Sequence, residues 1–351
     1  MGKPVNERNR TVIHRARVTT AALLAGLLAC GLAACGEREE PTGAGGSNEH
    51  IDLVLDYLPN ADHAGIYTAI ATGGFKTAAL DVKPRTPSDP AAPLKLLAAG
   101  RADLAISYEP ELLLARAKGA KLVSIGALVQ KPLTSIVSLG SKAIRKPADL
   151  QDAKVGTAGI PYQDAYLKTI LERASVAPAR VKSIDVGFNL VPALVSKRVD
   201  AVLGMFWNVE GVELERRKRD PHILRVEKIG VPTYNELIIV AREQDVRSRG
   251  PLLRRFMRAL GRGHASLRDH TGLGVDALVE AEPDLKRPLL RDQIRATLPV
   301  FFPASKKRPF GFQDPGEWKR YARWMFDNDL LSSPADEQRA FTNEFLPGEG
   351  I

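Results

Sequence analysis

Cysteine is almost absent from this sequence of 351 residues: only Cys30 and Cys35 occur, both near the N-terminus. The chain that follows them can therefore hold neither a disulfide framework nor a cysteine-based metal site. None of the six histidines has a metal-ligand spacing such as HxxxH, and no GxSxG nucleophile elbow or phosphate-binding glycine loop occurs. We interpret His264 and His270 as a solvated pair on one helix. These absences leave an unrecognised hydrolase as the catalytic alternative.

The first 34 residues have the pattern of an export signal. Five basic residues within the first 17 positions precede an apolar run over residues 18–34, in the order of the charged and hydrophobic regions of a signal peptide. The run leads into Leu32-Ala33-Ala34-Cys35, which resembles the cleavage signal of bacterial lipoproteins and predicts that Cys35 is lipidated. Cys30 follows a poorer version of this signal. An ordinary signal peptide and a simple membrane anchor are the alternatives.

Residues 35–50 are predicted to be a flexible tether, since glycine, proline and polar residues dominate them. The formal net charge of the chain is +9, and the five basic residues and one acidic residue that precede Cys35 leave +5 for the rest. The remaining basic residues are scattered along predicted helices and do not gather in one arm. We therefore expect a solvated basic surface and no binding of nucleic acid.

Short apolar strands alternate with helical segments through much of the chain, which predicts an α/β fold built from right-handed βαβ units. The length suits two lobes better than one core. We assign residues 51–139 to the first part of lobe 1, residues 140–234 to lobe 2, and residues 235–351 to a return into lobe 1 with C-terminal helices. Each lobe should hold a mixed, mainly parallel sheet flanked by helices. Two crossings, near Leu139 and Tyr234, would form a hinged cleft.

Polar and aromatic side chains follow the predicted strands, at the sheet edge where open α/β folds bind ligands. At the first such edge an apolar strand stops before Asp56, and Pro59 breaks the ladder. Either Asn60 or Asp62 can cap a helix that is entered at His63. His63 can line the cleft or only cap this helix. The full set of candidate ligand-binding residues is Asp56, Tyr57, Asn60, His63, Tyr108, Glu109, Tyr162, Gln163, Trp207, Asn208, Glu210, Tyr234 and Glu236.

Four blocks of the sequence follow in order the pattern of one family: LDYLPNADHAGIY, AAGRADLAISYEPELLLARAKGAKLVSI, VGTAGIPYQDAYLK and VDAVLGMFWNVEGVELE. They resemble the solute-binding proteins of ABC transporters for thiamine pyrimidine precursors such as formylaminopyrimidine, which are grouped with the eukaryotic hydroxymethylpyrimidine phosphate synthases. The resemblance implies a two-lobed periplasmic-binding-protein type II fold. It also implies a monomeric, lipid-anchored extracytoplasmic protein, with a permease and an ATPase on other chains.

The enzymes of that family can be compared with this chain residue by residue. Ser107 and Glu111 stand where the synthases carry the lysine that holds pyridoxal phosphate and an essential histidine. Residues 230–236, where the synthases carry iron-binding cysteines, contain no cysteine. Because a serine cannot form the Schiff base, we expect no synthase activity and no cofactor.

The implied ligand is a substituted aminopyrimidine, which is flat and edged with hydrogen-bond donors and acceptors. Tyr57 and Trp207 are the predicted walls of its site, and Asp56 and Glu210 are the predicted acceptors for an exocyclic amine. Hinge closure would bury the ligand between the lobes. The alternatives are riboflavin or another flat heterocycle on the same scaffold, and a subunit that signals the ligand to a membrane sensor.

Overall fold

The structure is a computed structural model that describes residues 1–2, 48–140, 144–333 and 337–348. The predicted lipidation site, Cys35, and nearly all of the predicted signal peptide and tether lie outside these residues. Among the described helices none is long and apolar enough to cross a membrane. Within the same ranges no group of three or more His, Cys, Asp or Glu side chains could hold a metal ion.

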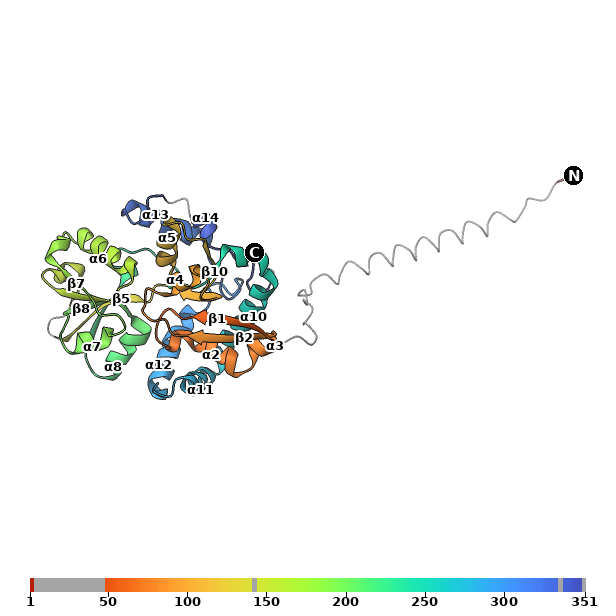
Figure 1. The fold of residues 1–351 in the computed structure, drawn as a ribbon, viewed down its shortest axis with the longest axis horizontal. Coiled ribbons are helices and arrows are strands. Elements are labelled where there is room, and N and C mark those ends of the chain that lie inside the picture. Colours follow the sequence, from red (N-terminus) through yellow and green to blue (C-terminus); the bar gives the residue numbers. More distant parts are fainter. Residues whose placement is uncertain (3–47, 141–143, 334–336, 349–351) are drawn as a thin grey trace. The chain divides into compact units, whose positions relative to one another are not determined.

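The first sheet combines early strands with one that returns late in the chain (Figure 1). Its order is β2 (Leu80–Arg85), β1 (Glu49–Val54), β3 (Leu104–Ser107), β10 (Leu237–Arg242) and β4 (Leu122–Val129). β1 pairs in parallel with β2 and β3, whereas β10 runs antiparallel to β3 and β4. β3, β4 and most of β10 are buried, as is typical of strands covered on both faces.

The second sheet repeats this arrangement. Its order is β7 (Lys182–Asp185), β6 (Lys154–Thr157), β8 (Ala201–Phe206), β5 (Thr134–Leu139) and β9 (Pro221–Arg225). β6 pairs in parallel with β7 and β8, and β5 runs antiparallel to β8 and β9. Each lobe therefore has the predicted mixed sheet with a single reversed strand.

The first crossing between lobes lies at residues 130–133, and the predicted boundary at residue 139 is wrong. β4 belongs to the first sheet and β5 to the second, so the chain crosses between them. Both strands are apolar and almost entirely buried, which is why the sequence pattern does not distinguish their sheets. The chain returns through the segment between β9 and β10.

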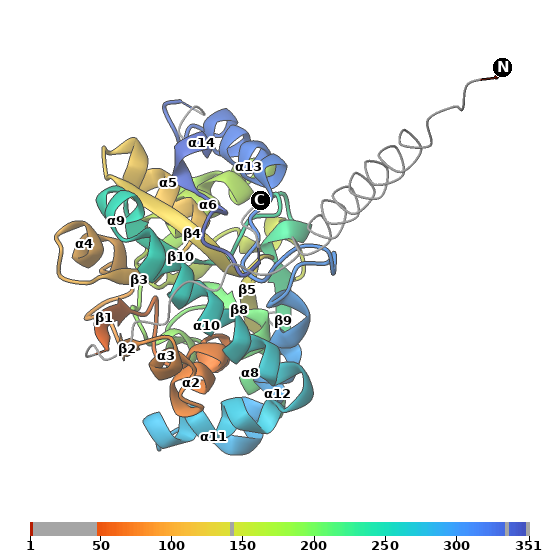
Figure 2. The ribbon, with the colours of Figure 1, turned by 90° about the vertical axis from the view of Figure 1, so that its right-hand side faces the viewer.

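Helices flank both sheets. Those that precede β10 are α2 (Ala64–Ala71), α3 (Gly74–Thr77), α4 (Pro93–Ala98), α5 (Glu109–Ala117), α6 (Pro161–Arg173), α7 (Leu190–Val195) and α8 (Val212–Arg216). Those that follow it are α9 (Glu243–Ser248), α10 (Gly250–Asp269), α11 (Thr271–Ala281), α12 (Arg287–Thr297), α13 (Pro315–Asp327) and α14 (Glu337–Ala340). Figure 2 shows α11 beside α2, and α13 with α14 on the side of α5, in agreement with their contacts.

The long helix α10 packs closely against α2, and this contact corrects the prediction for His264. A Cβ atom at Gly65 would lie 2.2 Å from the His264 ring, so only glycine permits the approach. His264 is fully buried, its Nδ1–H donates to the Leu260 carbonyl over 2.9 Å, and its ring contacts Phe310. Burial lowers the pKa of His264 to about 4. It is a neutral core residue and not part of a solvated pair.

Candidate functional site

Two adjoining cavities lie between the lobes, and they are called here the inner and the outer cavity. The inner cavity has a volume of about 20 Å³, and the outer cavity one of about 540 Å³. Seven of the thirteen predicted site residues line the inner cavity: Asp56, Tyr57, Asn60, Tyr108, Tyr162, Gln163 and Glu210. Phe206, Gly204 and Leu190, which the sequence analysis did not select, line it as well.

Asp56 follows β1 and is held by hydrogen bonds on both carboxylate oxygens. Oδ2 accepts from the Tyr108 hydroxyl over 2.8 Å, and Oδ1 lies 2.9 Å from His63 Nε2. The Asn60 backbone N–H donates to His63 Nδ1 over 3.1 Å, so the imidazole proton must sit on Nε2, which donates to Asp56. Burial, and then the charge of Asp56, raise the pKa of Tyr108 well above its usual value, which keeps its hydroxyl a donor.

The turn between β1 and α2 builds this arrangement from local sequence. Asn60 accepts the N–H of Asp62 over 2.8 Å and caps the 3-10 turn η2 (Ala61–His63), while His63 reaches back to the N–H of Asn60. This reciprocal cap fixes the imidazole behind Asp56. His63 is fully buried and lines neither cavity. It orients the carboxylate and does not form part of the cavity wall.

The second lobe contributes an amide to the inner cavity. Gln163 Oε1 accepts the Ala158 N–H over 2.8 Å. Gly204 has a φ of +114°, and a Cβ there would lie 2.4 Å from Gln163 Nε2. The register between β8 and β5 shifts at this position, so Gly204 is a bulge that makes room for the amide.

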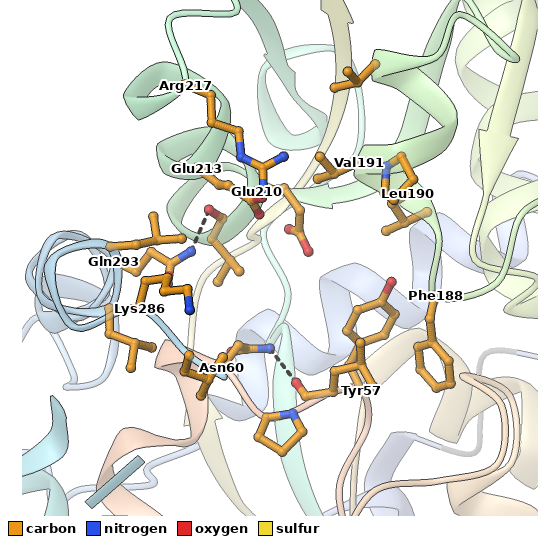
Figure 3. A pocket seen from close by; sticks show the side chains of 18 of the residues that line it. Tyr57, Asn60, Phe188, Leu190, Val191, Glu210, Glu213, Arg217, Lys286 and Gln293 are labelled. Atoms are coloured by element: carbon orange, nitrogen blue, oxygen red, sulfur yellow. Dashed lines mark hydrogen bonds and ion pairs between the residues drawn. The ribbon is translucent and has the colours of Figure 1, made fainter. Parts of the chain in front are cut away.

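Glu210 lies on a π-helical turn, η6 (Trp207–Gly211), that follows β8 directly. Its Oε2 accepts the Phe206 N–H over 2.8 Å, and Figure 3 shows its carboxyl group turned into the outer cavity. Burial raises the pKa of Glu210 to about 7, because removal from water disfavours the charged form. Near neutral pH this group can therefore accept or donate a hydrogen bond.

Tyr57 lines both cavities. Its ring meets that of Phe188, from the second lobe, edge to face with centroids 4.8 Å apart. Burial, followed by the charges of Glu210 and Asp56, raises the pKa of Tyr57. Figure 3 shows both rings at one side of the outer cavity.

Trp207 does not form the predicted wall. Its Nε1–H donates to the Pro132 carbonyl over 3.2 Å, and the Arg225 guanidinium lies 3.9 Å from its ring centroid. Trp207 lines neither cavity. The rings that the second lobe supplies to the inner cavity are Phe206 and Tyr162.

Three further predicted residues lie at the crossings between the lobes. Glu236 accepts hydrogen bonds from the N–H of Leu133 over 2.6 Å, from the N–H and hydroxyl of Thr134 over 2.8 Å each, and from the Tyr234 hydroxyl over 3.0 Å. Glu109 accepts from the backbone and the side chain of Asn235 over 2.7 Å each. Burial raises the pKa of Glu236 to about 7 and that of Glu109 to about 8. These residues fasten the two crossings and line neither cavity.

Asn208 joins the two lobes directly. Its Nδ2 donates to Asp62 Oδ1 and lies equally close to Thr297 Oγ1 on α12, both over 2.6 Å, and all three side chains are fully buried. Burial raises the pKa of Asp62 well above its usual value. We call Asp62, Asn208 and Thr297 the latch. It lies beside the cavities and lines neither.

Ser107 and Glu111 lie outside both cavities. Ser107 is buried in β3, with a relative exposure of 2%. Burial raises the pKa of Glu111, on α5, to about 7. Neither side chain faces the space where the other polar groups converge.

Comparisons with known proteins agree with the sequence resemblance. Residues 60–271 match the family described as NMT1/THI5 like. The formylaminopyrimidine-binding protein of Halalkalibacterium halodurans is 33% identical over 297 residues, which cover 84% of this chain and 90% of that protein. The 4-amino-5-hydroxymethyl-2-methylpyrimidine phosphate synthase of Legionella pneumophila is 25% identical over 300 residues, covering 85% of this chain and 92% of the enzyme.

The fold also matches solved structures. The alkanesulfonate-binding protein SsuA of Xanthomonas axonopodis pv. citri, bound to MOPS, superposes with a TM-score of 0.65 over 85% of this chain and 99% of that one. The sequence identity is 17%, so this likeness concerns the fold alone. The predicted two-lobed periplasmic-binding-protein fold is confirmed.

Proposed function

The chain belongs to the NMT1/THI5-like family, and from this premise we propose that it is an extracytoplasmic binding protein that captures a thiamine-related pyrimidine for an ABC importer. The observation that carries the proposal is the convergence, on one interlobe cavity, of aromatic rings from both lobes with the buried carboxyl group of Asp56 and the half-buried carboxyl group of Glu210. A flat ring with an exocyclic amine requires such walls and acceptors.

Each group has a chemical task in this proposal. The rings of Tyr57, Tyr108 and Phe206 cover the faces of the pyrimidine. Asp56 and Glu210 accept hydrogen bonds from its exocyclic amine, and the Gln163 amide pairs with a ring nitrogen. Asp56 is suited to this task because His63 and Tyr108 already fix its orientation, which reduces the entropy that binding would otherwise cost.

Hinge motion is part of the proposal because the inner cavity, at about 20 Å³, has room for little more than a water molecule. The lobes must part at residues 130–133 and in the segment between β9 and β10 before a pyrimidine can enter. Closure around the ligand would then present one surface to a permease. We further propose that Cys35 carries a lipid anchor and that the protein acts as a monomer.

We propose that the protein binds its ligand without converting it. Ser107 and Glu111 provide neither a Schiff-base amine nor an imidazole at the positions of the synthase residues, and both lie away from the cavities. Purified protein should show no aldimine absorbance when mixed with pyridoxal phosphate. Formation of a pyrimidine product from histidine and pyridoxal phosphate would contradict the proposal.

The test is calorimetric titration of the full chain with formylaminopyrimidine, hydroxymethylpyrimidine, thiamine and riboflavin. Tyr57→Ala should weaken pyrimidine binding by about 1–3 kcal/mol, the usual value of stacking a base on an aromatic ring. Phe326→Ala, on the half-buried face of α13, is the matched control and should keep full affinity. Binding of riboflavin without any pyrimidine would favour the alternative heterocycle, and equal affinity in both variants would refute the site.

A further inference from the structure

We propose that the outer cavity is a second compartment of the same binding site and takes an apolar second ring attached to the pyrimidine. This inference rests on the proposed function and concerns the part of the ligand beyond the first ring. The ligand class is a two-ring molecule, in which a flat hydrogen-bonding heterocycle is joined by a short link to a mainly apolar group.

The sizes of the two cavities support a ligand with one part in each cavity. The outer cavity, at about 540 Å³, falls in the range of about 300–1,000 Å³ that is typical of small-molecule sites. The inner cavity, at about 20 Å³, carries the densest set of aromatic and hydrogen-bonding groups but little free space. A ligand that used only the inner groups would leave most of the interlobe space to water.

The two cavities share part of their lining. Tyr57, Asn60, Leu190 and Glu210 line both of them. Because Glu210 faces the outer cavity while its Oε2 is held by Phe206 at the inner one, a ligand bonded to Glu210 would occupy the junction. A substituent on the outward side of that ligand would then extend past Tyr57 and Phe188.

The outer cavity has apolar walls that face each other across the cleft. Val191 and Val195 of α7 come from the second lobe, and Leu289 and Leu290 come from α12. Glu213 and Arg217 also line the cavity, and their charges offset each other because the two side chains are paired over 2.7 Å. Displacing water from the apolar walls favours an apolar group. Lys286 also lines this cavity, and its ammonium group disfavours a cationic second ring.

The experiment compares one-ring and two-ring pyrimidines by calorimetric titration of the full chain. The probes are hydroxymethylpyrimidine, thiamine, and the neutral thiophene analogue of thiamine. The two-ring probes should bind at least about tenfold more tightly, which corresponds to burial of a modest apolar area. The neutral analogue should bind at least as tightly as thiamine.

Two variants in the lining of the outer cavity test whether the second ring binds there. Leu289→Asp and Val195→Asp each place a charge on a partly exposed position, and should remove the two-ring advantage while leaving hydroxymethylpyrimidine affinity unchanged. Leu273→Asp is the matched control, because Leu273 on α11 is 38% exposed and lines neither cavity. It should leave all affinities unchanged. A melting temperature equal to that of the unaltered chain, measured without ligand, would show that each variant folds.

The outcomes separate this inference from the proposed function. If hydroxymethylpyrimidine binds but the two-ring probes bind no better, the second compartment is refuted and the proposed function stands. The same holds if Leu289→Asp weakens all three probes equally. If no pyrimidine binds the unaltered chain, the proposed function fails and this inference fails with it.

Discussion

The latch formed by Asp62, Asn208 and Thr297 should set how readily the lobes close, and Asn208→Ala tests this directly. The substitution removes the buried amide that lies 2.6 Å from both Asp62 and Thr297. Leaving a buried polar group without its partner costs about 1–3 kcal/mol. The equilibrium between closed and open lobes should therefore shift toward the open form by about 5-fold to 150-fold. Ligand affinity should fall by up to the same factor, since binding must supply the lost closure energy.

The assays are small-angle scattering of the ligand-free protein and calorimetric titration with the best-binding pyrimidine. The variant should have a larger radius of gyration without ligand and a weaker dissociation constant. Asn328→Ala is the control, because the Asn328 side chain donates to the Trp324 carbonyl over 2.7 Å at the end of α13, away from the latch. Unchanged scattering and unchanged affinity for Asn208→Ala would refute the role of the latch.

The same latch predicts a pH dependence with a definite sign. Burial, together with the nearby carboxyl groups of Asp56 and Glu210, raises the pKa of Asp62 in the closed form, whereas an opened latch returns it toward its ordinary value. Closure therefore takes up a proton in the pH window between these two values. The closed fraction should be constant below the ordinary pKa and should fall as pH rises through the window, by at most about tenfold per pH unit. Asp62→Asn should flatten this dependence, and a closed fraction that rises with pH in the unaltered protein would contradict it.

Three further predictions concern single residues. Gly204→Ala should abolish pyrimidine binding and lower the free energy of unfolding by about 1–3 kcal/mol. The reason is that φ at this position is +114° and the new Cβ would lie 2.4 Å from Gln163 Nε2. Calorimetric titration measures the loss of binding, and urea unfolding measures the loss of stability. Tyr108→Phe should weaken binding by about 1–3 kcal/mol, since Asp56 loses the donor that holds Oδ2; equal affinity by titration would exclude Tyr108 as a positioning residue. Cys35→Ser should prevent incorporation of a fatty-acid probe whereas Cys30→Ser should not, and label that persists in the Cys35→Ser protein would refute the anchor.

The part of the site that local sequence builds could be predicted. Asp56, Asn60 and His63 lie within eight residues of each other. The end of the strand, the helix cap and the imidazole can therefore be recognised in one short segment of the sequence. Their separate tasks were not predictable. The decision that His63 supports the carboxylate depends on hydrogen bonds that close only in three dimensions.

The choice between Phe206 and Trp207 shows a limit of sequence reasoning. The two aromatic residues are neighbours, and successive side chains at the end of a strand point to opposite sides. A shift of the strand by one residue therefore decides which ring faces the cavity and which ring contacts the segment that crosses between the lobes. Phe206 ends β8 and lines the inner cavity, while Trp207 begins the π-helical turn and contacts Pro132. Gly204 was missed for a related reason, since the space that it leaves is filled by Gln163 from another element.

The buried carboxyl groups between the lobes suit the proposed closure around a ligand. Asp62 is held by a side chain of the opposite lobe, while Glu109 and Glu236 are held by groups at the crossings. Water can replace such hydrogen bonds when the lobes part, so each one contributes only about 0.5–1.5 kcal/mol net to the closed form. An apolar interface of similar extent would cost about 25 cal/mol for each Å² exposed to water. If the lobes open as proposed, a contact built from replaceable hydrogen bonds should keep the open and closed forms close in free energy, so that a ligand of ordinary affinity can shift the equilibrium between them.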